Sequence, residues 1–376
     1  MPDHAAPANP PFRAEHIGSL LRPAALLDAR QRRDAGDITE QELRAIEDEA
    51  IREVVAFQEK VGLEVVTDGE FRRGTYSDSF TKSGITGVSV RETEDTGWSK
   101  SETHGHRTAR NIPCVVDRIQ WAGPQNAKNF AYLKSLTSRT PKVTIPGPAY
   151  VHYRAGRANI SSDIYPDLDN FWADMVSAYH AEMQALAEAG CTYLQIDETS
   201  LVKLGDPRVR QLLVERGDTW NGLLKTYIEV VNAVVAGAPE GLSVGIHICR
   251  SQNPQWQADT GYDPIAPALF NDMNLDFYFL EYDNERAGSF EPLAHVPKGK
   301  RVVLGIVGSH KPELETADYV KSRIEEATQY ISLDQLALSP QCGFATGADM
   351  ANPAALKLQA DKLALVVEVS REVWGD

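Results

Sequence analysis

Cysteine is scarce in this sequence, with four among 376 residues, which argues against a fold held together by disulfides. Long apolar runs are missing too, and none reaches the roughly 20 residues that a membrane-spanning helix needs. Basic residues are in deficit, because 38 Lys and Arg stand against 53 Asp and Glu, a formal net charge of −15. Such a charge does not suit a nucleic-acid or anionic-membrane partner. We therefore expect a cytoplasmic protein, with reduced thiols, that acts on small molecules.

The length and hydrophobic content allow a large buried core. With 376 residues, 42% of them hydrophobic, the chain suits one α/β barrel or two smaller domains. Residues 1–12 are rich in Pro and Ala but lack the basic start and apolar centre of a signal peptide, so a disordered tail is expected. Residues 13–376 are expected to form a single catalytic domain. The sequence leaves open whether the protein forms a homo-oligomer.

Helical and strand patterns alternate along the chain, which favours a parallel sheet wrapped by helices. Thr39 and Glu42 have the spacing of a capping box, and Gly62 is placed to end the helix that they begin. Further helices are expected over 167–189 and 220–236, and a last one from Asn352. Eight strands are expected: Arg13–Leu20, Glu64–Thr67, Lys142–Pro146, Thr192–Ile196, Ser243–Ile248, Phe277–Leu280, Arg301–Val307 and Gln335–Leu338.

Residues 83–121 interrupt this alternation. Two β-type stretches, 84–91 and 108–120, flank a polar segment that contains Trp98, His104 and His106, a pattern typical of an inserted hairpin. His104 and His106 could be read as a second metal site, but a solvated loop is the simpler interpretation, and the role of the insertion stays open.

The strand count predicts a (β/α)8 barrel with one hairpin insertion. In such a barrel the C-terminal ends of all strands meet at one mouth, whereas an open doubly wound sheet would not bring all eight together. The polar residues fit this arrangement, because they lie at or just beyond strand ends: Ser19, Glu70, Asp197, His247, Cys249, Glu281, His310 and Cys342.

Four of these residues can ligate a metal. His247 and Cys249 are two positions apart, so on a strand they point to the same face. Glu281 follows 32 positions after Cys249, and Cys342 follows 61 positions after Glu281, which suits ligands on separate strands. Imidazole, thiolate and carboxylate together suit zinc. The alternatives are a core histidine beside buried cysteines, or a purely structural zinc.

The donor set also indicates the chemistry. Two thiolates and one carboxylate on a dication leave a negative centre, which is a poor Lewis acid for making hydroxide from water. An incoming thiol could instead replace a weak ligand, Glu281 or water, lose its proton and attack a methyl carbon. Alkyl transfer to sulfur is therefore the predicted reaction.

Several motifs together resemble the C-terminal catalytic barrel of cobalamin-independent methionine synthase, in an order that covers almost the whole chain after the tail. They are His16-Ile17-Gly18-Ser19, Asp68-Gly69-Glu70, Gln195-Ile196-Asp197-Glu198, His247-Ile248-Cys249 and Pro340-Gln341-Cys342-Gly343. The opening, residues 12–23, is similar to that of single-barrel relatives, which are thought to be S-methyltransferases that use other donors, including methylated corrinoid carriers.

This resemblance implies a role for each motif. Zinc held by His247, Cys249, Glu281 and Cys342 would activate homocysteine. Ile17, Gly18 and Ser19 would bind the substrate carboxylate through backbone and hydroxyl donors, and Glu70 and Asp197 would bind its ammonium. His310 would be the acid that protonates the leaving group. Read without the resemblance, Glu70 and Asp197 could cap helices, His310 could hold a backbone carbonyl, and Ser19 could shape a turn.

The methyl donor stays open between methyl-folate and a methyl-corrinoid. The family has a tryptophan that stacks on the pterin after the position of Gly147 and Pro148, where this chain offers Tyr153 and Arg154.

Other functions also stay open. An epoxyalkane:coenzyme M transferase would share the zinc pattern but would need cations for a sulfonate. A lyase similar to uroporphyrinogen decarboxylase would leave the ligands unexplained. A non-catalytic zinc-stabilised binding protein is the third.

Overall fold

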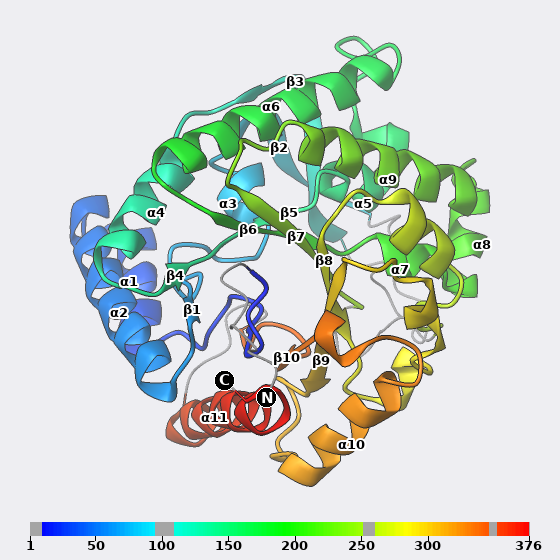
Figure 1. Cartoon of the computed structure of the whole chain (residues 1–376). Coiled ribbons are helices and arrows are strands. Elements are labelled where there is room, and N and C mark those ends of the chain that lie inside the picture. The colour runs from blue at the N-terminus through cyan, green and yellow to red at the C-terminus, as the bar shows by residue number, and fades with distance from the viewer. Residues whose placement is uncertain (1–9, 95–108, 251–259, 346–351, 376) are drawn as a thin grey trace.

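The computed structural model describes residues 10–94, 109–250, 260–345 and 352–375. Six parallel strands form its central sheet, in the order β5-β6-β7-β8-β9-β10, and the helices surround the strands (Figure 1). The strands are β5 (Val143–Pro146), β6 (Tyr193–Glu198), β7 (Ser243–Ile248), β8 (Phe277–Glu281), β9 (Arg301–Val307) and β10 (Leu336–Pro340).

Two further segments close this sheet into a barrel. β1 (Val65–Val66) pairs in parallel with β4 (Thr140–Pro141), which runs directly into β5. On the opposite edge Ala14 forms a parallel bridge with Leu338 of β10. The first segment meets β1 where the Leu20 N–H donates to the Gly69 carbonyl at 3.1 Å. The predicted (β/α)8 barrel is confirmed.

The first of the eight predicted strands, Arg13–Leu20, is wrong in detail, because it forms only an isolated bridge at Ala14. Its carbonyls explain the difference. The His16 and Gly18 carbonyls accept hydrogen bonds from the side chains of Lys142 and Thr67. A regular backbone ladder with the neighbouring strands is therefore replaced by side-chain contacts along this segment.

The helix signals in the sequence are confirmed at both ends of α2. The Thr39 hydroxyl accepts from the Glu42 N–H and the Glu42 carboxylate accepts from the Thr39 N–H, while Gly62 ends the helix with φ 105°. Asn352 caps the last helix through the Ala355 N–H. The helices are α1 (Ala24–Asp34), α2 (Glu40–Val61), α3 (Asp78–Thr81), α4 (Gln125–Ser135), α5 (Tyr150–Ala155), α6 (Asp169–Glu188), α7 (Leu201–Leu204), α8 (Pro207–Glu215), α9 (Trp220–Ala236), α10 (Ala317–Ala327) and α11 (Pro353–Trp374).

The inserted hairpin is also confirmed. β2 (Ile85–Glu94) and β3 (Ala109–Trp121) pair antiparallel. Its base is fixed to α6, because the Trp121 Nε1–H donates to Glu182 Oε2 at 2.6 Å. The polar segment between the strands, with Trp98, His104 and His106, lies outside the described residues.

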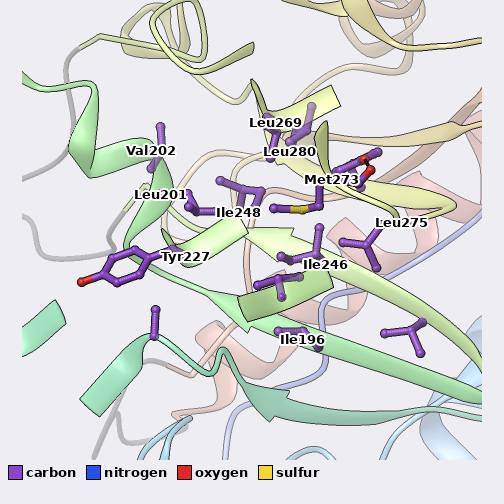
Figure 2. Close-up of a cluster of buried hydrophobic side chains, with 14 of the residues drawn as sticks. Ile196, Leu201, Val202, Tyr227, Ile246, Ile248, Leu269, Met273, Leu275 and Leu280 are labelled. Atoms are coloured by element: carbon purple, nitrogen blue, oxygen red, sulfur yellow. Dashed lines mark hydrogen bonds between the residues drawn. The ribbon is translucent and has the colours of Figure 1, made fainter. Parts of the chain in front are cut away.

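Alternation along the strands separates two buried environments. Figure 2 shows Ile196, Ile246 and Leu280, from β6, β7 and β8, packed together in the main hydrophobic cluster, which also includes residues of α7 and α9. Their neighbours in sequence have the opposite direction and face the barrel interior. At Gly245 an added Cβ would lie 1.8 Å from the ring of Phe277, so the interior has no room for a side chain there. Because of this alternation, polar residues at the C-terminal strand ends can point into the barrel and line its mouth.

Candidate metal centre

The four predicted ligands converge at the C-terminal ends of three strands. His247 lies near the end of β7, Cys249 follows it, Glu281 ends β8 and Cys342 follows β10. One ligand atom from each lies within 4.8 Å of the others. All four residues are at most 9% exposed. The structure therefore brings together side chains that are up to 95 positions apart in sequence.

Backbone hydrogen bonds fix the positions of these ligands. The Cys249 N–H donates to the Glu198 carbonyl at 2.9 Å. The Tyr262 hydroxyl accepts from the Glu281 N–H at 2.8 Å and donates to the Ile248 carbonyl at 3.3 Å, so it joins the ends of β7 and β8. The Gln341 N–H donates to the Val307 carbonyl at 2.8 Å, which holds the residue before Cys342.

The electrostatics of the four groups fit a bound cation. Neither ring nitrogen of His247 has a hydrogen-bond partner within the described residues, although both are buried. Burial, with the nearby Cys249, raises the pKa of Glu281 well above its ordinary value. The Cys342 thiol, by hydrogen bonding to Cys249, holds the pKa of the Cys249 thiol well below its usual range. Thiol, carboxyl and imidazole groups gathered in one buried cluster are the ligand types that zinc takes.

Two carboxyl groups lie beside this cluster. Glu70 is 4% exposed and Asp197 is 6% exposed. Glu70 Oε1 accepts from the Thr144 hydroxyl at 3.0 Å, and Asp197 Oδ1 accepts from Gln195 at 2.7 Å. Burial, and then the charge of Glu70, raise the pKa of Asp197 to about 7. Neither side chain caps α3 or α7, the helices that follow β1 and β6.

Gly18 and Ser19 lie against the same region. Gly18 has φ 148°, and a Cβ there would lie 2.8 Å from Thr144 and 3.0 Å from Glu70. A Cβ on Gly343, the residue after Cys342, would lie 1.9 Å from Ser19 Oγ. The Ser19 hydroxyl donates to the Ala345 carbonyl at 3.1 Å, so the donors left in the Ile17–Ser19 segment are backbone N–H groups.

His310 lies in a turn three residues beyond the end of β9, and it is exposed. The loop that carries it is fixed by two residues that the sequence analysis missed. Lys362 of α11 is buried, and its Nζ donates at 2.6 Å to the carbonyls of Gly308 and Glu313 and at 3.1 Å to Glu315 Oε2. Glu315 Oε1 accepts from the Gly308 N–H at 2.9 Å. The sequence did offer a signal for this contact, because Lys362 stands among the apolar positions of the last helix and must therefore find a buried partner.

The fold and the four possible metal ligands together define the class of protein. It is a (β/α)8 barrel with two thiols, an imidazole and a carboxyl group gathered at its C-terminal mouth. Within that class, the chain belongs to the cobalamin-independent methionine synthase family, because the family model described as "Cobalamin-independent synthase, Catalytic domain" matches residues 12–364. The resemblance seen in the motifs is thereby confirmed. As a member of this family, the chain is a methyltransferase.

Individual relatives agree with this assignment. The uncharacterized protein YxjG of Bacillus subtilis is 39% identical, over 97% of this chain and 95% of its own. The methionine synthase of Pyrococcus abyssi is 26% identical, over 87% of this chain and 84% of its own. A solved structure of a putative vitamin-B12 independent methionine synthase from Listeria monocytogenes is 32% identical with a TM-score of 0.76, covering 98% of this chain and 99% of that one. Among the described residues no helix is long and apolar enough to cross a membrane.

Proposed function

We propose that this protein is a zinc-dependent S-methyltransferase that methylates the thiol of homocysteine, forming methionine, or a close thiol. One observation carries the proposal: the ligand atoms of His247, Cys249, Glu281 and Cys342 lie within 4.8 Å of one another at the barrel mouth. These four residues would hold a zinc ion, whose positive charge would lower the pKa of an incoming thiol and leave it nucleophilic at neutral pH.

The surrounding residues bind and orient the thiol substrate. Glu70 and Asp197 present buried carboxyl groups to its ammonium. The N–H groups of Ile17, Gly18 and Ser19 bind its carboxylate. The same carboxyl pair disfavours coenzyme M, because two acidic groups would face its sulfonate. A decarboxylase-like lyase would have no use for the thiol pair.

The reaction forms an S–CH3 bond and breaks the bond between the methyl group and its donor. If the donor is methyl-folate, the thiol proton must end on the donor nitrogen, and His310 carries it there. If the donor is a methyl-corrinoid, the electron pair of the broken bond stays on the corrin metal, the thiol proton passes to solvent, and the leaving group needs no acid. We place the protein in the cytoplasm, where its four cysteines stay reduced as free thiols.

The test is a set of parallel incubations of the zinc-loaded protein with homocysteine and one donor each: methyl-folate, methylcobalamin or S-methylmethionine. Methionine formed with at least one donor, and with none in the Cys342→Ala variant, is the expected result. A parallel set uses coenzyme M as acceptor. Product from coenzyme M with none from homocysteine would overturn the assignment of the acceptor, and no methylation of either thiol would overturn the proposed function.

A further inference from the structure

Three consecutive carbonyls beneath the mouth are each bound by the side chain of a different residue: Lys142, between β4 and β5, Gln195 of β6, and Thr67, which follows β1. Lys142 Nζ donates to the His16 carbonyl. Gln195 Nε2 donates to the Ile17 carbonyl at 2.7 Å, and the Thr67 hydroxyl donates to the Gly18 carbonyl at 2.7 Å. The three side chains belong to residues that are at most 2% exposed.

Gln195 connects this segment to the carboxyl group across the site. Lys142 Nζ lies 2.9 Å from Gln195 Oε1 and 3.2 Å from Glu15 Oε2. Because an ammonium can only donate, the amide oxygen of Gln195 must face Lys142 and its NH2 must face away. That NH2 reaches both the Ile17 carbonyl and Asp197 Oδ1, each at 2.7 Å. The amide of Gln195 therefore fixes the distance between the Ile17 carbonyl and the carboxyl group of Asp197.

These contacts decide which way the backbone N–H groups of the Ile17–Ser19 segment point. With its carbonyls bound inside the barrel, the backbone N–H groups of Ile17, Gly18 and Ser19 have no acceptor in the part of the chain that the structure describes. Adjacent free N–H groups form an anion-binding concavity. The burial of the Lys142–Glu15 ion pair is weak evidence for a stabilising role, since apolar side chains of similar volume often stabilise interiors as well or better.

We propose that Lys142, Gln195 and Thr67 are positioning residues for the amino-acid end of the substrate. They hold the N–H groups of the Ile17–Ser19 segment and the carboxyl group of Asp197 at the separation that a substrate carboxylate and ammonium require. This inference rests on the proposed function. It explains why a core that could be apolar carries a hydrogen-bonded polar network directly below the mouth.

The test compares binding and turnover of zinc-loaded Gln195→Met with the wild type. The probes are methionine, titrated by calorimetry, and two methyl acceptors, homocysteine and propanethiol, which lacks the carboxylate and ammonium. We expect methionine affinity to fall at least tenfold and KM for homocysteine to rise similarly. Zinc content and propanethiol turnover should stay within twofold. Thr67→Val, a milder change, should lower methionine affinity in the same direction.

Glu182→Gln is the matched control, because it changes a buried carboxyl group on α6 that is bonded to Trp121; its methionine affinity should equal that of the wild type. Unchanged methionine affinity in both test variants would overturn the inference, and so would an equal fall in turnover of homocysteine and propanethiol. If the wild type binds no methionine and methylates propanethiol but not homocysteine, the amino-acid acceptor fails and the inference fails with it. If neither thiol is methylated, the proposed function itself fails.

Discussion

His247 Nε2 and Glu281 Oε1 lie 3.7 Å apart, and each side chain is 2% exposed. Two ligands of one tetrahedral zinc ion, with bonds of about 2.1 Å, lie about 3.4 Å from each other. The observed separation is close to that value and too long for a direct hydrogen bond. A shared zinc ion, as proposed above, would account for this approach of two buried polar groups, and the two cysteines would complete its ligands.

Replacing one thiol should remove the metal. In Cys342→Ala we expect zinc affinity to fall by roughly two orders of magnitude or more, because a thiolate ligand is lost from a four-ligand site. Metal analysis after competition with a chelator measures the loss. Cys191→Ala is the control, since Cys191 is a buried free thiol outside the cluster. Equal zinc retention in both variants would contradict the ligand assignment.

Removing the acid should distinguish the donors. His310→Gln is expected to lower turnover with methyl-folate by about 10²-fold to 10⁴-fold, because the nitrogen of the folate leaves only when it is protonated. With methylcobalamin as donor the loss should be less than about tenfold, since no proton transfer accompanies cleavage of the carbon–metal bond. Rates with both donors at saturating homocysteine measure this. The same loss with both donors would show that His310 acts otherwise.

The Lys362 contact should stabilise both the fold and the loop that carries His310. Lys362→Met leaves the buried Gly308 carbonyl, the Glu313 carbonyl and the Glu315 carboxylate without this donor, so we expect a loss of about 3–5 kcal/mol in the free energy of unfolding. Lys357→Met, on the same helix, breaks only an exposed pair with Asp361 and should cost less than about 0.5 kcal/mol. Urea unfolding of both variants checks this. Similar losses would contradict the assigned role of Lys362.

Glu182 should make stability depend on pH. Burial raises its pKa, so the folded state holds the proton more tightly than the unfolded state does. Its contribution is therefore fully present below the unfolded pKa, about 4.3, and is lost as pH rises through the folded pKa. In Glu182→Gln the unfolding free energy, measured by urea unfolding, should fall less between pH 5 and pH 8 than it does in the wild type. An unchanged pH dependence would contradict this.

The sequence predicted the features that depend on local pattern. The capping box at Thr39, the last helix at Asn352 and the strands that carry His247 and Glu281 follow from spacing along the chain. The ligand cluster was also accessible, because parallel strands of a closed barrel must end at one mouth.

The sequence did not reveal the contacts made through space. Lys142 reaches Glu15, and Lys362 reaches Gly308, across 127 and 54 positions. The residues next to a lysine in the sequence do not indicate which acceptor, far away along the chain, the folded structure brings to it. The first strand was predicted as regular because its residue pattern does not show that side chains replace its backbone ladder.

Zinc-edge X-ray absorption on the purified protein, with and without homocysteine, tests the central claim most directly. We predict one zinc per chain with two sulfur and two nitrogen or oxygen neighbours, and three sulfur neighbours once homocysteine is bound. Zinc whose sulfur count does not change when homocysteine binds, or protein that methylates homocysteine without metal, would contradict this account.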